Sequence, residues 1–183
     1  MSFDNGCDGC LIGHPFSKIF SDENYANLNN DRGQRDFMLK MNGARVAKCK
    51  RAGFDAVEFD VVDTWQTSAS RSGWHISAQT QLIFNRGLAS IAHRYGLAAG
   101  LKNDLAQIPQ LEPVFDFAVN EQCFQYHECD PLEWFVNDGK AVFTVEYRSA
   151  PAAFCPKAEA LGFSSIVKAP NFSLYDQPYT PCR

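Results

Sequence analysis

Residues 54–65, with the sequence FDAVEFDVVDTW, predict the fold class of this chain. The stretch opens as a near-continuous apolar run of β-branched and aromatic residues, which is typical of a strand buried on both faces of a parallel sheet. It ends in two acids, Asp60 and Asp63. Because carboxylates are costly to place at the end of a buried strand, the stretch is a candidate active-site strand.

Strand-like and helix-like segments alternate on either side of this stretch, which predicts a parallel α/β architecture. Residues 1–23 lack a clear period and are expected to form a loop. Ser77 is the predicted N-cap of one helix, and Gly53, Gly96 and Gly162 stand where helices should end. The predicted strands are residues 25–28, 54–65, 97–101, 114–119, 140–145 and 163–167, and the predicted helical segments are residues 34–52, 78–95, 104–111, 131–137 and 151–161.

Two of these helices carry an apolar stripe at helical spacing, and the stripe is expected to face the core. In residues 34–52 the stripe is Phe37, Met41, Ala44 and Ala47, and in residues 78–95 it is Leu82, Leu88 and Ile91.

Polar side chains gather where the predicted strands end. In parallel α/β folds the ligand site lies at the carboxyl ends of the strands, and in a (β/α) barrel all of those ends surround one mouth. The strand starts carry turn glycines instead, so the chain has a clear functional polarity. The residues at the strand ends are Asp60, Lys102, Asn103, Glu121, Glu146, Tyr147 and Lys168.

The composition is that of one globular domain spanning all 183 residues, 45% of them hydrophobic. A net charge of −4 without a basic cluster argues against a nucleic-acid partner. No apolar run approaches the roughly 20 residues that cross a bilayer, so no membrane partner is expected. The start of the chain has neither a basic segment nor an apolar core, so no signal peptide is expected in it.

Seven cysteines exceed the usual content of a reduced cytosolic domain. Cys7 and Cys10 form a single CxxC pair, a weak zinc signal without further ligands nearby. The four histidines share no metal-binding spacing, so neither a metal nor a cofactor is expected. A disulfide between Cys123 and Cys129 would hold the loop after the 114–119 strand. These late cysteines, with the glycosylation sequon at Asn171, favour an oxidising compartment.

The strand-end residues allow two kinds of chemistry and one purely structural role. Asp60 and Glu121 lie on strands two apart in order, and two carboxylates facing a sugar-sized gap are the arrangement of glycoside hydrolysis. Each acid could instead be neutralised by Lys102 or Lys168. A desolvated lysine at a strand end could also form a Schiff base with a carbonyl substrate, which makes a Schiff-base lyase the alternative enzyme class. Asp63 could bind substrate or cap the loop that follows it.

Four segments resemble one known family: GFDAVEFDVVD, HRYGLAAGLKND, FDFAVNEQCFQYHEC and GKAVFTVEY. They look like glycoside hydrolase family 114, the endo-α-1,4-polygalactosaminidases, which are (β/α)8 TIM barrels. The resemblance runs from about residue 12 to residue 168. It implies a retaining mechanism with Asp60 as nucleophile and Glu121 as acid/base. The implied substrate contacts are Asp63, Lys102, Asn103, Tyr126, Glu146, Tyr147 and Lys168.

The resemblance also implies a partial barrel, because a family barrel has about two further strand–helix units ahead of the matched region. An N-terminally truncated chain is therefore expected, and an inactive or sugar-binding remnant of the barrel is the alternative to an enzyme. Secretion is typical of the family and agrees with the cysteines. The expected partner is a galactosamine-rich polysaccharide, and the expected state is a monomer.

Overall fold

The structure is a computed structural model that describes residues 2–4, 12–18, 21–30 and 33–182. It is an α/β fold in which most strands pair in parallel. Packing divides the chain into two compact units, Met1–Asp104 and Leu105–Arg183, and each unit is described by itself.

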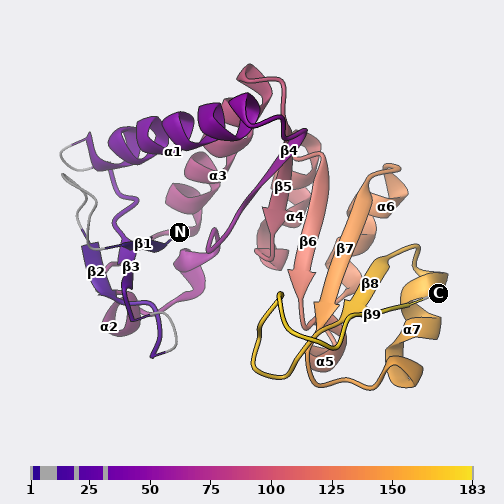
Figure 1. Cartoon of the computed structure of the whole chain (residues 1–183). Coiled ribbons are helices and arrows are strands. Elements are labelled where there is room, and N and C mark those ends of the chain that lie inside the picture. The colour runs from indigo at the N-terminus through magenta and orange to yellow at the C-terminus, as the bar shows by residue number, and fades with distance from the viewer. Residues whose placement is uncertain (1, 5–11, 19–20, 31–32, 183) are drawn as a thin grey trace. The chain divides into compact units, whose positions relative to one another are not determined.

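The first unit begins with a small antiparallel sheet of three strands in the order β1-β3-β2 (Figure 1). These strands are β1 (Ser2–Asp4), β2 (Ile12–Pro15) and β3 (Glu23–Ala26). The expected loop over residues 1–23 is therefore wrong for β1 and β2. Both strands are too short to show a period, and each forms by pairing with β3, Ser2 opposite Tyr25 and Ile12 opposite Ala26.

Helix α1 (Gln34–Arg51) has the predicted bounds but buries a different face from the predicted one. Its buried residues are Gln34, Met38, Asn42 and Val46, whereas Ala44 is exposed. Two residues of the buried face, Gln34 and Asn42, are polar. A search for apolar residues at helical spacing therefore selected the neighbouring face of the helix. Asn42 is accommodated because its side-chain amide donates to the Met38 carbonyl at 2.9 Å, as a buried amide must.

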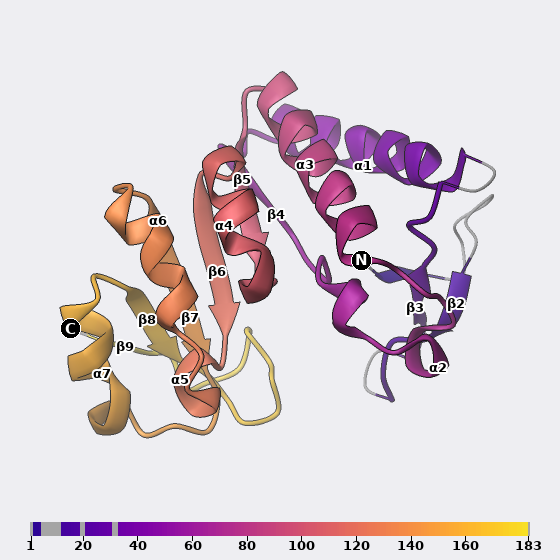
Figure 2. The ribbon, with the colours of Figure 1, turned by 180° about the vertical axis from the view of Figure 1, so that it is seen from behind.

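Helix α3 (Ala78–Arg94) packs beside α1, as Figures 1 and 2 both show. The Ser77 side chain accepts a hydrogen bond from the Thr80 backbone at 3.1 Å, which confirms the predicted N-cap. Leu88 and Ile91 are buried as expected, while Leu82 is only half-buried. Gly96 has a φ of 65° just after the helix, the left-handed turn that ends it without a Cβ clash.

Strands β4 (Ala56–Phe59) and β5 (Ala98–Lys102) form a parallel pair in which Phe59 lies opposite Leu101. Within the described residues, β4 is not buried on both faces as its apolar run suggested: Phe59 is buried, but Glu58 is exposed. Short helical turns follow β4 at η2 (Thr64–Gln66) and α2 (Ala69–Ser72).

The second unit has three parallel strands, β6 (Phe117–Glu121), β7 (Ala141–Glu146) and β8 (Ser164–Val167), with β9 (Thr180–Pro181) antiparallel to β8. Strand β6 begins later than predicted because proline-containing turns occupy the residues before it. The helical elements are η3 (Leu105–Gln107), α4 (Ile108–Leu111), η4 (Glu112–Val114), α5 (Cys123–Tyr126), η5 (Asp130–Leu132), α6 (Glu133–Asn137) and α7 (Pro151–Ala160).

The two faces of this sheet differ in burial. One face packs against helices, which Figure 2 shows in front of the strands, and it buries Ala118, Val142 and a hydrogen-bonded pair, Thr144 and Ser165. The other face carries Phe143, which is 44% exposed. Because side chains alternate along a strand, Glu121 shares this open face, and its side chain is accessible to a ligand.

None of the helices in the described part of the chain is long and apolar enough to cross a membrane.

Candidate active site

Asp60 and Lys102 meet because of strand register. Phe59 lies opposite Leu101, so the next residue on each chain, Asp60 and Lys102, falls side by side at the carboxyl ends of β4 and β5. The ammonium of Lys102 donates to the Asp60 carboxylate at 2.9 Å. The Asp60 side chain is 67% exposed, whereas that of Lys102 is 9% exposed. The buried ammonium of Lys102 thus holds a carboxylate that is itself exposed to solvent.

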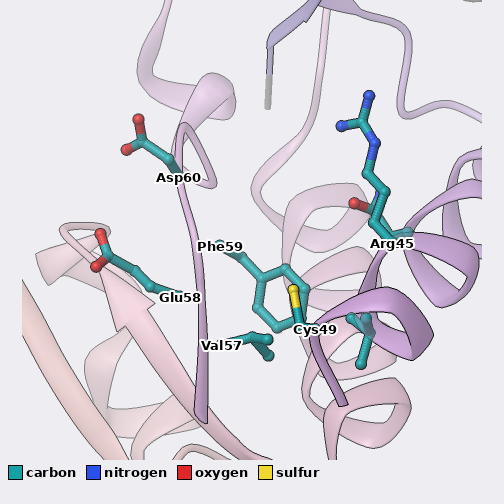
Figure 3. Close-up of a pocket in the computed structure, with 8 residues that line it drawn as sticks. Arg45, Cys49, Val57, Glu58, Phe59 and Asp60 are labelled. Atoms are coloured by element: carbon teal, nitrogen blue, oxygen red, sulfur yellow. The ribbon is translucent and has the colours of Figure 1, made fainter. Parts of the chain in front are cut away.

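Figure 3 shows how β4 sorts its side chains. Glu58 and Asp60 extend to one side of the strand, and Val57 and Phe59 extend to the other, toward Arg45 and Cys49 of α1. A cavity of about 220 Å³ lies between α1 and the strand. The carboxylate of Asp60 therefore points away from the α1 packing.

Lys102 determines the charge state of Asp60. Partial burial by itself raises the pKa of the Asp60 carboxyl, but the positive charge and hydrogen bond of Lys102, with the Val61 N–H, more than offset burial. The net effect lowers the pKa of Asp60 below its ordinary value. Asp60 is consequently held as a carboxylate, the form that a nucleophile needs.

The loop after β4 is tightly held. Val61 has a φ of 52°, a left-handed conformation that is unfavourable for a β-branched residue and therefore marks local strain. The Asn85 side-chain amide donates to the Val62 carbonyl at 2.9 Å and to the Asp104 carboxylate at 2.9 Å. The Trp65 indole donates to the other Asp104 oxygen at 2.8 Å. These bonds hold the backbone that carries Asp60.

Asp104 and Asn85 are supporting residues that the sequence did not single out. Asp104 directly follows Lys102 and Asn103 at a strand end, which was the available signal, whereas nothing in the helix around Asn85 marked it. Burial raises the pKa of the Asp104 carboxyl to about 7, although the hydrogen bonds from Trp65 and Asn85 oppose the shift. Asn103 lies between Lys102 and Asp104 with a φ of 53° and is half-buried.

Asp63 is half-buried, and burial raises the pKa of its carboxyl. Its side chain makes no capping hydrogen bond to the following turn, so the capping alternative finds no support. Asp63 remains the candidate substrate contact on this loop.

Glu121 ends β6 and accepts a hydrogen bond from the Tyr147 hydroxyl at its Oε1 atom. Register again explains the contact: Glu121 lies opposite Val145 on β7, and Tyr147, two residues further on, projects from the same face. The Tyr147 ring is 2% exposed. Tyr147 therefore supports Glu121 from beneath and is too deeply buried for the substrate contact that the sequence predicted.

The loop after Glu121 is fastened at several points. A disulfide joins Cys123 and Cys129, as predicted. Asn120 accepts from the Cys123 backbone at 3.0 Å, and Glu146 accepts from the Phe124 backbone at 2.9 Å. Tyr126, on the same loop, is 59% exposed.

Glu146 is fully buried, which contrasts with its predicted substrate contact. Its two carboxylate oxygens accept from the Phe124 N–H and from the Ser149 hydroxyl, at 2.9 Å and 3.2 Å. Burial raises the pKa of this carboxyl, against the effect of those hydrogen bonds. The physical reason for the difference is that Glu146 is still inside β7, on the face opposite Glu121.

Lys168 is 4% exposed, donates to the Asp176 carbonyl at 2.7 Å and lies over the Tyr179 ring. Lys102 is engaged by Asp60. A Schiff-base lysine must present an accessible uncharged amine, so the contacts of both lysines weigh against a lyase. Lys168 anchors the segment after β8 instead of reaching outward to a substrate.

The remaining cysteines are partly accounted for. Cys155 and Cys182 form a second disulfide, a pairing that the sequence did not predict. Cys49 is a free thiol. Cys7 and Cys10 lie outside the described residues, so the CxxC pair stays untested. Among the residues that the structure does describe, no group of His, Cys, Asp and Glu side chains could hold a metal ion.

The model of glycoside-hydrolase family GH114 matches residues 11–183. The chain belongs to glycoside-hydrolase family GH114. It is also similar to the crystal structure of Ega3 from Aspergillus fumigatus in complex with galactosamine, with a TM-score of 0.74 and 28% sequence identity. That likeness covers 88% of this chain and 66% of the Ega3 chain, so this GH114 chain spans just under two thirds of the protein it matches. No curated protein matches it significantly.

Within each unit the structure brings a GH114 candidate carboxylate together with one predicted neighbour. Asp60 meets Lys102 in the first unit, and Glu121 meets Tyr147 in the second. Of the other predicted contacts, Asp63, Asn103 and Tyr126 retain accessible surface, whereas Glu146 and Lys168 are buried supports.

Replacing Lys102 with methionine is expected to shift the acid limb of the pH profile of kcat/KM to higher pH. Without the ammonium, burial outweighs the remaining hydrogen bond from the Val61 N–H, so the pKa of Asp60 rises. At acidic pH a larger fraction of the enzyme then carries a protonated Asp60, which cannot act as a nucleophile. Initial rates across an acid-to-neutral series measure the shift. Lys140→Met, which breaks the unrelated pair with Glu112, is the matched control. An acid limb that stays in place in Lys102→Met contradicts the role given to this pair.

Proposed function

We propose that this chain is a retaining endo-hydrolase of α-1,4-linked, galactosamine-rich polysaccharide, with Asp60 as nucleophile and Glu121 as acid/base. The observation that most supports the proposal is that the two carboxylates have different surroundings. Asp60 is kept ionised by Lys102, whereas Glu121 accepts a hydroxyl hydrogen bond from Tyr147. Different environments are what allow two carboxyl groups to take separate roles in one reaction.

In the proposed mechanism, Asp60 attacks the anomeric carbon while protonated Glu121 gives its proton to the departing glycosidic oxygen. The glycosidic C–O bond breaks and an ester bond to Asp60 forms. Glu121, now a carboxylate, then takes a proton from water as the water oxygen attacks the same carbon. The ester bond to Asp60 breaks, and the two inversions leave the anomeric configuration unchanged.

The proposed substrate class follows from family membership and from the galactosamine complex of Ega3. A galactosamine unit carries an ammonium group, which a carboxylate such as Asp63 can hold in a charge-assisted contact. Asn103 and Tyr126 would supply a polar contact and a stacking surface. Glu146, Tyr147 and Lys168 would act from beneath by holding the loops in place.

Two disulfides in the described part of the chain support a further proposal, that the protein works outside the cell. Disulfides of this kind persist in oxidising compartments. A polymeric substrate is also met there. We expect a monomer, because the proposed site uses residues of one chain.

The test is digestion of a defined α-1,4-linked galactosamine polymer, with NMR detection of the anomeric proton of the first product. We expect oligosaccharides of mixed length and a first product in the α configuration. A β-1,4-linked glucosamine polymer, which carries the same charge in another linkage, is the control and should stay intact. A β-configured first product contradicts retention. Binding without any hydrolysis would assign the chain to the sugar-binding alternative instead.

A further inference from the structure

The segment after β8 lies on the tyrosine that supports Glu121. Phe172 packs edge-on against the Tyr147 ring, with 4.9 Å between ring centroids and 61° between ring planes. The Arg148 guanidinium lies over the Phe172 ring, 5.4 Å from its centroid. Tyr147 in turn donates its hydroxyl to Glu121. Three side chains therefore form a continuous line of contact from the loop surface to the candidate acid/base.

The backbone at Phe172 is in an unfavourable conformation. Its φ is 65°, in the left-handed region that suits glycine and disfavours a bulky aromatic residue. A strained residue of this kind persists only where its surroundings hold it. Around Phe172 they do: its N–H donates to the Ala169 carbonyl at 3.0 Å, and Asn171 and Ser173 both bond to Asp176.

Lys168 completes the fastening of this loop. Its ammonium donates to the Asp176 carbonyl at 2.7 Å and lies 5.7 Å from the centre of the Tyr179 ring. Lys168 thus connects the start of the 168–179 loop to its later part, and Phe172 is the side chain of this loop that packs against Tyr147. Since the Tyr147 ring is 2% exposed while Phe172 is 36% exposed, Phe172 acts as a cover.

We propose that Phe172 is a positioning residue that fixes the Tyr147 ring and, through the Tyr147 hydroxyl, the orientation of the Glu121 carboxyl. The catalytic part of this inference rests on the proposed hydrolase function, but the contact between Phe172 and Tyr147 can be tested without any turnover.

The decisive variant is Phe172→Gly. Glycine suits a φ of 65° better than phenylalanine does, so the loop backbone is favoured while the ring is removed. We expect kcat to fall by about 10- to 100-fold with KM changed by less than about twofold, since a misoriented acid/base affects the chemical step. The separate variant Phe172→Tyr keeps an aromatic ring at this position, so its kcat should stay close to that of the wild type. Leu174→Ala, which truncates a 56% exposed residue of the same loop, is the control and should leave kcat unchanged.

A double-mutant cycle separates this role from a general structural one. If Phe172 acts through the Tyr147 hydroxyl, then Phe172→Gly should change kcat by less than about twofold in a Tyr147→Phe background. Full additivity of the two losses, or a Phe172→Gly enzyme with wild-type kcat, would overturn the proposal.

Nitration by tetranitromethane, followed by peptide mapping, provides the readout that is independent of activity. Tyr147 should be protected in the wild type and modified in Phe172→Gly, while the exposed Tyr126 reacts in both. If the chain hydrolyses no polymer yet shows this change, the proposed function fails and the packing role stands. If Tyr147 stays protected in Phe172→Gly, the packing role fails whatever the activity.

Discussion

Asp60→Asn and Glu121→Gln are each expected to lower kcat on a galactosamine polymer by about 10²- to 10⁴-fold. This range is the usual contribution of a positioned general acid or base to the rate. Asparagine keeps the size of Asp60 but cannot form the ester to the sugar, and glutamine keeps the hydrogen bond from Tyr147 but has no proton to transfer. Both variants should remain folded, because neither change alters volume. Initial rates with matched circular dichroism spectra measure the effect.

The two variants also distinguish nucleophile from acid/base. On a substrate with an activated aryl leaving group, which departs without being protonated, azide added to Glu121→Ala should restore turnover. The product should be a glycosyl azide of retained configuration, since azide then attacks the sugar ester on Asp60. Azide added to Asp60→Ala should yield the inverted product by direct attack. Reversal of these outcomes would exchange the two roles. Glu159→Gln, which changes an exposed carboxylate on α7, is the matched control and should keep its activity.

Loss of the two disulfides is expected to affect stability and activity to different extents. In the chain-entropy account, stabilisation grows with the length of the closed loop. The Cys155–Cys182 bond spans 27 residues and the Cys123–Cys129 bond spans 6. Paired replacement by serine should thus lower the free energy of unfolding by about 3.5 kcal/mol for the first and about 2.2 kcal/mol for the second. Denaturant unfolding of the two variants measures this order.

Activity should follow the opposite order. Cys123 and Cys129 flank the turn that begins two residues after Glu121, whereas Cys155–Cys182 joins α7 to the segment after β9. Loss of the short bond should therefore lower kcat more at temperatures where both variants are folded. Cys49→Ser, at the free thiol, should change neither property. Full activity without the Cys123–Cys129 bond would show that the hydrogen bonds of Asn120 and Glu146 hold the loop alone.

The sequence was informative wherever a pattern was local. Helix bounds, the Ser77 cap and the glycines after the helices followed from spacing and from backbone preference, and these were confirmed. The Cys123–Cys129 bond was predictable because its partners are close along the chain. The order of strands and helices placed Asp60 and Glu121 at strand ends, since alternation alone determines which end of a parallel strand is which.

Pairing between distant segments was decided only by the tertiary structure. Strands β1 and β2 are too short to carry a period and exist through their contact with β3. The face that α1 buries depends on a hydrogen bond that lets Asn42 into the core. No local pattern marked either feature.

The same distinction applies to the candidate site. The sequence by itself determined the family and the polar residues at the strand ends, because those features are written in contiguous motifs. The tertiary structure decided which of these side chains are exposed and which are buried. Glu146, Tyr147 and Lys168 are buried, Asn85 and Asp104 are hydrogen-bonded to each other, and Phe172 packs against Tyr147. The physical reason is that a side chain's burial and hydrogen-bond partners depend on register and packing between segments that lie far apart in the chain.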